Sequence, residues 1–378
     1  MLSMLLFGLS RTLVTLILSR AFCGLLNGNI GVMKTALGEL TDATNRAEAF
    51  ALMPAVWAFG ATMGPLLGGS LSRPADRFPV VFASNFWKKF PYFLPCVATA
   101  SYVFAVLLIT GLFFEETVQC GKASSCSPCS SSSSYKLLVV NSDEELDPAE
   151  RPVSFRGLFT FPVVISIANY AALGFLSTSV NALLPLFFHT PIELGGLNLD
   201  PARIGYIMGV YGAGMGLFQM LFFAKIVRRW GTRRVFIVSM ATFVPVFMLF
   251  PVASLIAKRW GLGWGLWVAV GLILFLLFIM DTAFGCIFMY VTESAPNRRS
   301  LGATNGLAQT TVSSARAVGP ALTTSLFSFS VQKNLLHGHG VYVVLAIFSC
   351  GAVYLGTLLP HRIWSKQVGS EDASDSEY

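Results

Sequence analysis

The stretch Thr41-Asp42-Ala43-Thr44-Asn45-Arg46 precedes one apolar segment, and a similar stretch, Thr292-Glu293-Ser294-Ala295-Pro296-Asn297-Arg298, precedes another. Each apolar segment carries a Gly-Pro pair, at Gly64-Pro65 and at Gly319-Pro320. The two copies are 251 positions apart at the threonines and 255 apart at the Gly-Pro pairs. A repeated helix–loop–helix unit in an apolar chain predicts a membrane transporter built from two similar halves.

The composition supports a membrane protein. The chain is 54% hydrophobic and 12% charged, whereas soluble domains carry about 25% charged residues. A chain this apolar cannot hide its surface in one water-soluble core, so we expect lipid to be its solvent. The net charge of +7 does not indicate nucleic-acid binding, because the basic residues lie at the ends of apolar segments, as membrane topology requires.

Apolar segments long enough to cross a bilayer recur along the chain. A helix needs about 20 apolar residues to do so. A partial segment covers 1–9. The nine full ones are 12–36, 49–71, 91–114, 160–188, 203–224, 235–257, 264–291, 302–329 and 341–360. They lack the strict alternation of a membrane β-barrel. The fold class is therefore an all-α polytopic membrane protein.

Residues 115–157 break this pattern with a serine run and the acidic cluster Asp143-Glu144-Glu145. Such a segment buries too little apolar surface to fold alone, and we interpret it as a disordered linker. The expected organisation is a partial N-terminal bundle (1–114), the linker (115–157), a C-terminal six-helix bundle (158–361) and a tail (362–378).

Lysine and arginine counts orient the chain. The linker and the loops on its side carry 14 of these residues, and the opposite loops carry 9. Positive charge marks the cytoplasmic side, so we expect the linker and the C-terminus to be cytoplasmic. Whether the membrane is the plasma membrane or the vacuolar one stays open.

Three motifs together resemble the major facilitator superfamily. Gly60-x-x-x-Gly64-Pro65-x-x-Gly68-Gly69 resembles the antiporter motif of the family's fifth helix, and Arg20–Gly28 resembles the arginine motif of its fourth. Phe223–Arg234 is similar to the basic loop after the eighth helix. The best resemblance is to the drug:proton antiporter branch, including its fungal and plant zinc-induced-facilitator-like members. It implies two six-helix bundles.

The second half contains six segments, whereas the first contains three and a partial one. The second half begins at residue 160, and the two copies of the repeat are 251 positions apart. A complete first half would therefore begin about 90 residues before Met1. We therefore expect an N-terminal truncation that removes the family's first two helices and most of the third. A gene-model artefact and a real isoform are both open.

A charge within a bilayer is a functional hypothesis by default, because it costs at least about 2.5–3.5 kcal/mol. Arg20 shares one helix stripe with Gly24, Asn27, Gly31 and Lys34, at spacings of 4, 3, 4 and 3. This stripe is expected to line a cavity, with Arg20 and Asn27 on the substrate or proton pathway. The resemblance implies the same, since the family's arginine is linked to proton transfer. A structural bond to a neighbouring carbonyl is the alternative.

Asp281 is the one acid deep in any expected span. Removal from water favours the protonated carboxyl group, so Asp281 is suited to exchanging protons at ordinary pH. The alternative is a buried ion pair with Arg316 on the next span, which would also give a strong mutant phenotype.

Two further sets of residues are expected to control access. A helix-contact seal is predicted where small residues let helices approach closely, at Gly60, Gly64, Pro65, Gly68, Gly69, Arg316, Gly319 and Pro320. A cytoplasmic gate of salt bridges is predicted at Glu39, Asp42, Arg46, Arg229, Arg233, Glu293 and Arg298. Rigid packing without movement and solvated loop charges, worth about 0–1 kcal/mol per pair, are the respective alternatives.

Weaker signals are also present. Asn169 and Asn181, with Tyr170 and Ser177, are possible polar groups of a cavity. Cys126 and Cys129 lack a second pair of metal ligands, and His337 with His339 do not complete a site, so no metal is expected. The chain contains no phosphate-binding loop and no nucleophile–base pattern, so neither a cofactor nor an enzymatic activity is expected.

The function predicted from the sequence is secondary transport of a small molecule, by proton-coupled export through alternating access. The expected partners are the lipid bilayer, the substrate and protons, and the chain is expected to be a monomer that binds no nucleic acid. The alternative is a truncated, non-transporting fragment or a membrane sensor on a transporter scaffold. The sequence does not identify the substrate.

Overall fold

The computed structural model describes the protein over residues 1–26, 29–42, 45–77, 80–82, 84–113, 155–336 and 338–360. Every regular element in these ranges is a helix. The expected linker lies outside the described residues except for its last three positions, and the tail 362–378 lies outside them entirely.

The described part of the first half contains seven helices: α1 Leu2–Leu9, α2 Leu13–Leu25, α3 Asn29–Leu40, α4 Arg46–Leu71, α5 Pro74–Arg77, α6 Asn85–Lys89 and α7 Phe93–Phe113. A reciprocal cap begins α2, because the hydroxyl groups of Thr12 and Thr15 each accept a hydrogen bond from the other residue's N–H. The expected partial segment corresponds to α1, and the described residues of the expected span 12–36 belong mostly to α2 and α3.

The second half contains the helices α8 Phe161–His189, α9 Pro201–Trp230, α10 Thr232–Ala241, α11 Phe243–Trp260, α12 Trp264–Glu293, α13 Leu301–Gln332 and α14 Gly340–Thr357. Short 3-10 turns lie at Phe155–Leu158, Ile192–Leu194 and Arg298–Ser300. Gly231, with φ of 81°, separates α9 from α10, and Gly261, with φ of 68°, ends α11. Both backbone angles are in the left-handed region that glycine adopts without strain.

Seven helical segments of the described residues are long and apolar enough to cross a membrane. They are Leu13–Leu40, Phe93–Phe113, Phe161–His189, Arg203–Trp230, Thr232–Trp260, Trp264–Glu293 and Gly340–Thr357. The other two expected spans coincide with α4 and α13, which are 26 and 32 residues long but contain more polar and small residues. The total of nine crossings therefore stays a prediction.

Apolar side chains both fill the core and cover the outside. In the second half, Phe187, Phe243 and Phe247 are fully buried. On the outside, Leu13 is 72% exposed and Trp264 is 89% exposed. An apolar exterior around a packed helical core is the surface that a lipid environment favours.

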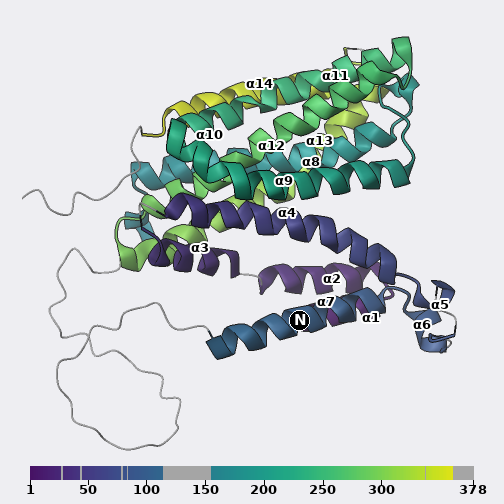
Figure 1. Ribbon diagram of the computed structural model, residues 1–378, viewed down its shortest axis with the longest axis horizontal. Coiled ribbons are helices and arrows are strands. Elements are labelled where there is room, and N and C mark those ends of the chain that lie inside the picture. The colour runs from purple at the N-terminus through teal and green to yellow at the C-terminus, as the bar shows by residue number, and fades with distance from the viewer. Residues whose placement is uncertain are drawn as a thin grey trace, which may run out of the picture.

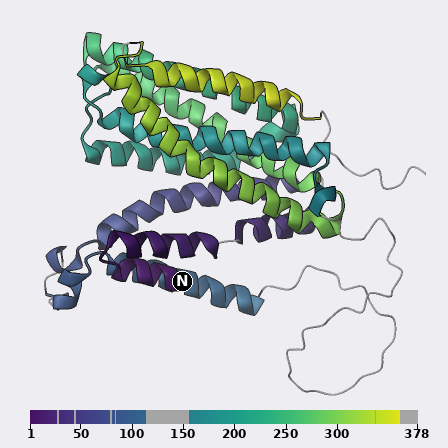
Figure 2. The same ribbon diagram turned by 180° about the vertical axis from the view of Figure 1, so that it is seen from behind.

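The two halves meet at one end of the molecule, where α7 ends and α8 begins, which we call the linker end. Here α3 and α4 pack against α9, α12 and α13, while α1 packs on α2 and α7. Figures 1 and 2 show α4 diverging from α9 away from the linker end, with α1, α2 and α7 lying apart from the second half. The contacts between the halves are therefore concentrated toward the linker end.

Candidate functional site

A buried lysine from the first half lies among aromatic and amide groups of the second half. Lys34 of α3 is 1% exposed. Its Nζ donates to the hydroxyl oxygen of Tyr170 on α8 at 2.9 Å and to Oε1 of Gln309 on α13 at 3.4 Å. The same nitrogen lies 3.9 Å from the ring centre of Phe288 on α12 and 4.5 Å from that of Tyr170. One ammonium group thus joins α3 to three helices of the other half.

Arg316 lies beside this lysine. It follows Gln309 by seven positions on α13, which places both on one face of the helix. Its guanidinium carbon lies 5.4 Å from the ring centre of Phe284 and 5.9 Å from that of Tyr170. Cation–π attraction operates over such distances. We call Lys34, Tyr170, Gln309 and Arg316, together with the rings of Phe284 and Phe288, the cationic cluster.

Asp281 lies on α12 and is 7% exposed. The Tyr211 hydroxyl of α9 donates to its Oδ2 at 2.7 Å, so the alternative of an ion pair with Arg316 finds no support in the contacts of the described residues. Tyr211 is held in place by stacking on Phe278, with ring centres 5.5 Å apart. Asp281, Phe284 and Phe288 are spaced by 3 and 4 positions, so the acid lies on the same stripe of α12 as the rings of the cationic cluster.

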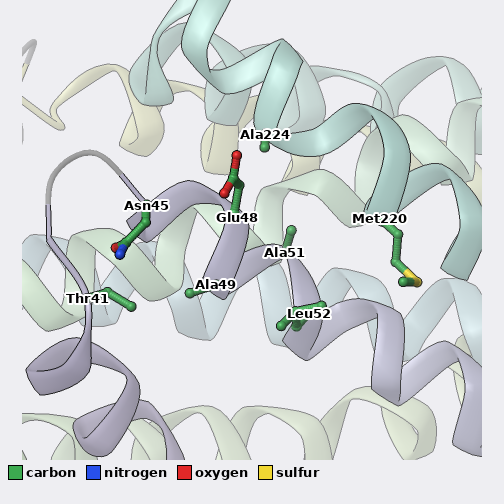
Figure 3. Close-up of a pocket in the computed structure, with 8 residues that line it drawn as sticks. All are labelled: Thr41, Asn45, Glu48, Ala49, Ala51, Leu52, Met220 and Ala224. Carbon is green, nitrogen blue, oxygen red and sulfur yellow. The ribbon is translucent and has the colours of Figure 1, made fainter.

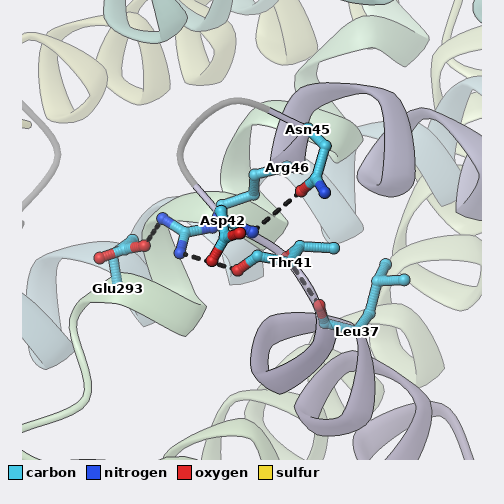
Figure 4. Close-up of polar contacts among 6 residues, drawn as sticks. All are labelled: Leu37, Thr41, Asp42, Asn45, Arg46 and Glu293. Carbon is cyan, nitrogen blue, oxygen red and sulfur yellow. Dashed lines mark hydrogen bonds and ion pairs between the residues drawn. The ribbon is translucent and has the colours of Figure 1, made fainter.

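The two copies of the repeated stretch meet at the linker end (Figure 4). Arg46, from the first copy, forms an ion pair with Glu293, from the second, and also donates to the carbonyl oxygen of Thr41 at 3.4 Å. The Asn45 side chain accepts a hydrogen bond from the N–H of Asp42 at 2.9 Å, directly before α4 begins. Both side chains of the ion pair are largely buried, at 21% and 13% exposed.

A second bridge between the halves is more exposed. Nη2 of Arg228, on α9, lies 2.5 Å from Oε1 of Glu48 on α4. Glu48 also lines a cavity of about 360 Å³ between α4 and α9, together with Thr41, Asn45, Ala49, Ala51, Leu52, Met220 and Ala224 (Figure 3).

The remaining gate residues have other surroundings. Arg229 and Glu39 are exposed. Arg233 donates to the carbonyl oxygens of Leu359 and Thr357, at the end of α14, at 2.6 and 2.5 Å. The side chain of Arg298 lies outside what the structure describes.

Arg20 lines a different cavity. This space, of about 1030 Å³, lies in the first half among α1, α2, α7 and Gly68 of α4. The Arg20 guanidinium carbon lies 5.0 Å from the ring centre of Phe7. Asn27 lies outside the described residues. Arg20 and Lys34 belong to the same expected polar stripe but have different surroundings. Arg20 lines the cavity of the first half, whereas Lys34 contacts the second half.

One close approach between α4 and α9 in the described part of the chain involves Gly212, which is not among the expected seal residues. A methyl group added at Gly60, Gly64 or Gly68 would meet no other atom within 4 Å, whereas one added at Gly212 of α9 would clash with the Thr62 hydroxyl of α4. The surroundings of Pro65 and Gly69 lie outside the described part.

The second Gly-Pro pair packs within the C-terminal bundle. A methyl group at Gly319 would lie 2.6 Å from the Thr178 hydroxyl oxygen of α8. Pro320 follows it inside α13 and is partly exposed. This pair therefore serves the contact between α8 and α13.

The two asparagines of α8 face different surroundings. Asn169 is buried and donates to the carbonyl oxygens of Ile165 and of Leu355 on α14, at 2.9 and 3.2 Å, so it joins helices within the second half. Asn181 is exposed.

Seven residues of the site were not proposed as site residues from the sequence: Lys34, Gln309, Tyr211, Arg228, Glu48, Phe284 and Phe288. Lys34 stood on the polar stripe, and Arg228 stood in the basic loop beside Arg229. The signal that would have found Lys34 is its charge within an apolar segment, the same criterion that selected Arg20 and Asp281. Tyr211 and Gln309 are ordinary helix residues in the sequence, and only the packing of α9 and α13 reveals their partners.

Comparisons with known proteins agree with this architecture. Residues 1–320 match the sequence model of the Major Facilitator Superfamily. The chain therefore belongs to this superfamily, as its motifs predict. It is an integral, multi-pass membrane protein whose relatives are transporters.

Several relatives resemble the chain over most of its length. It is 29% identical to the major facilitator-type transporter psiT2 of Psilocybe cyanescens, over 92% of this chain and 72% of that protein. It is 28% identical to the major facilitator superfamily multidrug transporter mfsB of Aspergillus fumigatus, over 99% and 71%. It is also 29% identical to the protein ZINC INDUCED FACILITATOR 1 of Arabidopsis thaliana, over 90% and 71%.

A solved structure shares the fold. The human organic anion transporter MFSD10 superimposes with a TM-score of 0.62 at 16% identity, over 94% of this chain and 74% of that one. At this identity the likeness concerns the arrangement of helices alone.

Proposed function

We propose that this protein exports a small molecule in exchange for protons, by alternating access of its two halves. The observation that supports this most directly is the contact between the two copies of the repeated stretch, Arg46 with Glu293, at the one end where the halves meet. In a rocking mechanism, interactions at one end must form while the other end is open. We assign this conformation to the state closed at the linker end and take that end as cytoplasmic.

The gate in this proposal has two layers. Arg46–Glu293 and Arg228–Glu48 hold the linker end closed, and the packing of α4 on α9 at Gly212 lies deeper. Opening toward the cytoplasm breaks both ion pairs and separates α3 from α13. The seal residues Gly64, Pro65, Gly68 and Gly69 follow Thr62 in the sequence, and we propose that they and Gly60 close the opposite end.

Asp281 is the proposed proton carrier. Its carboxyl group is buried and accepts one hydrogen bond from Tyr211, so protonation changes the charge of a largely dehydrated site. It shares a face of α12 with the rings that contact Lys34 and Arg316, which supports a proposed proton site close to the contact between the halves. Arg20, in the cavity of the first half, is proposed to lie on the substrate or proton pathway.

The test is transport by the full chain reconstituted in liposomes under an imposed pH gradient, with a panel of radiolabelled cationic, neutral and anionic aromatic compounds. We expect at least one compound to move against its gradient when protons flow the other way. Asp281→Asn should retain exchange of that compound without gradient-driven accumulation, and Glu193→Gln, which alters an exposed acid, should behave as the unmodified protein. The proposal fails if the unmodified protein moves no compound in response to the gradient.

A further inference from the structure

We propose that the cationic cluster binds the acidic group, a carboxylate or a sulfonate, of an aromatic organic anion. This inference deepens the proposed transport function, and it rests on that function for the claim that the bound anion is a transported substrate. Binding itself depends only on the residues of the cluster, which come from α3, α8, α12 and α13.

The first argument concerns charge. Lys34 and Arg316 are two cations that share the ring of Tyr170. The described ion pairs include Arg46–Glu293 and Arg228–Glu48, and no ion pair is described for Lys34 or Arg316 within the described residues. Asp281, the nearby acid on α12, receives its hydrogen bond from Tyr211. Burying positive charge without an anion is costly, so a negatively charged ligand has a favourable place here.

The second argument concerns unused hydrogen-bond donors. Lys34 directs its ammonium group at two neutral oxygens, of Tyr170 and Gln309, and an ammonium group has three donors. Arg316 is held by aromatic rings, with no hydrogen bond to any group in the described part of the chain. Its five N–H groups form a planar fork that matches two acidic oxygens. Arg316 is partly exposed, so part of its side chain is accessible from outside the bundle.

The third argument concerns the walls of the cluster. The rings of Tyr170 and Phe288 meet edge to face, with centres 5.6 Å apart, and Phe284 lies 6.0 Å from Phe288. Aromatic surface beside two cations favours an organic anion with an aromatic body over a small hydrated ion such as phosphate. Gln309 adds an amide whose nitrogen points toward Ser313, at 3.5 Å.

The position of the cluster connects binding to movement. Lys34 belongs to the first half, whereas Arg316 and the rings belong to the second. An anion that contacts both cations therefore bridges the halves. Its binding energy differs between the closed and the open linker end, which is the condition for a ligand to shift that equilibrium.

The experiment measures thermal unfolding of the purified full-length chain in detergent with benzoate, benzamide or benzylamine. These compounds share a phenyl ring and differ in charge. We expect benzoate to raise the unfolding temperature, benzamide to have a smaller effect and benzylamine to have none. A ligand that binds only the folded state stabilises it by RT ln(1 + L/Kd), where L is the free ligand concentration.

The variants distinguish charge from structure. Arg316→Gln should lower the affinity for benzoate by tenfold or more. Arg316→Lys should lower this affinity less, because lysine keeps the positive charge. Lys34→Met should also abolish the benzoate effect, and Arg316→Gln carries the test alone if Lys34→Met does not fold. Arg259→Gln is the matched control, because Arg259 also lies over an aromatic ring, 5.8 Å from that of Trp260, at the end of α11. It should bind benzoate normally.

The inference is overturned if benzoate and benzylamine stabilise the protein equally, if benzoate has no effect, or if Arg316→Gln binds benzoate like the unmodified protein. These results are independent of the transport assay. Gradient-driven movement of cationic compounds, with no benzoate binding, would retain the proposed function and exclude the anion site. Benzoate binding without any transport would retain the anion site and contradict the proposed transport function.

Discussion

Replacing Glu293 with glutamine removes the carboxylate that Arg46 contacts across the two halves and leaves the length of the side chain unchanged. Breaking a fully buried pair costs about 3–5 kcal/mol, whereas an exposed pair contributes about 0–1 kcal/mol. The side chains of Arg46 and Glu293 are 21% and 13% exposed, so solvent screens the pair in part. We expect Glu293→Gln to cost the closed linker end about 1–3 kcal/mol, between these limits.

The exposed bridge supplies a matched comparison. The side chains of Arg228 and Glu48 are 56% and 58% exposed, so Glu48→Gln should change the closed state little. Hydrogen exchange of the backbone at the start of α4 and at the end of α12 measures this difference, because exchange there reports local opening. A loss of 1–3 kcal/mol corresponds to an increase of about 5- to 150-fold in the population of the open form.

A double-mutant cycle separates the ion pair from the local effects of each substitution. If Arg46 and Glu293 interact directly, Arg46→Gln combined with Glu293→Gln should cost less than the sum of the two single substitutions. The reasoning is refuted if the two costs add, or if Glu48→Gln increases exchange as much as Glu293→Gln does.

Three further substitutions test other parts of the account. Tyr211→Phe removes the hydroxyl that donates to Asp281, and should shift the pH dependence of transport toward higher pH, since protonation of the carboxyl group becomes easier without that donor; an unchanged pH profile would separate Tyr211 from proton transfer. Gly212→Ala should lower the free energy of unfolding by about 1–3 kcal/mol, because the added methyl group overpacks against Thr62. Gly60→Ala places its methyl group in open space and should preserve or raise the free energy of unfolding. Equal effects of the two substitutions would contradict the close contact at Gly212. Arg233→Gln should leave the carbonyl oxygens of Leu359 and Thr357 without this donor and increase hydrogen exchange at the end of α14; unchanged exchange there would show that the contact is unimportant.

Helix positions could be predicted from the sequence because each depends on a local property. A run of about 20 apolar residues is recognisable without knowing its neighbours, and the nine expected spans each coincide with a helix or a pair of helices. The family could be predicted from motifs such as Arg20–Gly28, whose order along the chain is itself part of the signal.

Partners between the halves could be predicted only where the repeat brought them together. Arg46 and Glu293 occupy the two copies of one stretch, and both were expected at a gate. In contrast, Arg228 rather than Arg229 reaches the first half, because a difference of one position rotates a side chain by about 100° around the helix axis. Lys34 was visible as a charge, but its aromatic and amide partners come from three other helices.

The measurement that tests the central claim most directly is a pair of distances between spin labels on the two halves. One pair of labels, at Leu40 and Arg299, reports the linker end, and the other, at Lys88 and Trp264, reports the opposite end; the residues at all four positions are exposed. We predict that changing from alkaline to acidic buffer alters the two distances in opposite directions, and that Asp281→Asn abolishes this response. Distances that change together, or a response that persists in Asp281→Asn, would contradict proton-coupled alternating access.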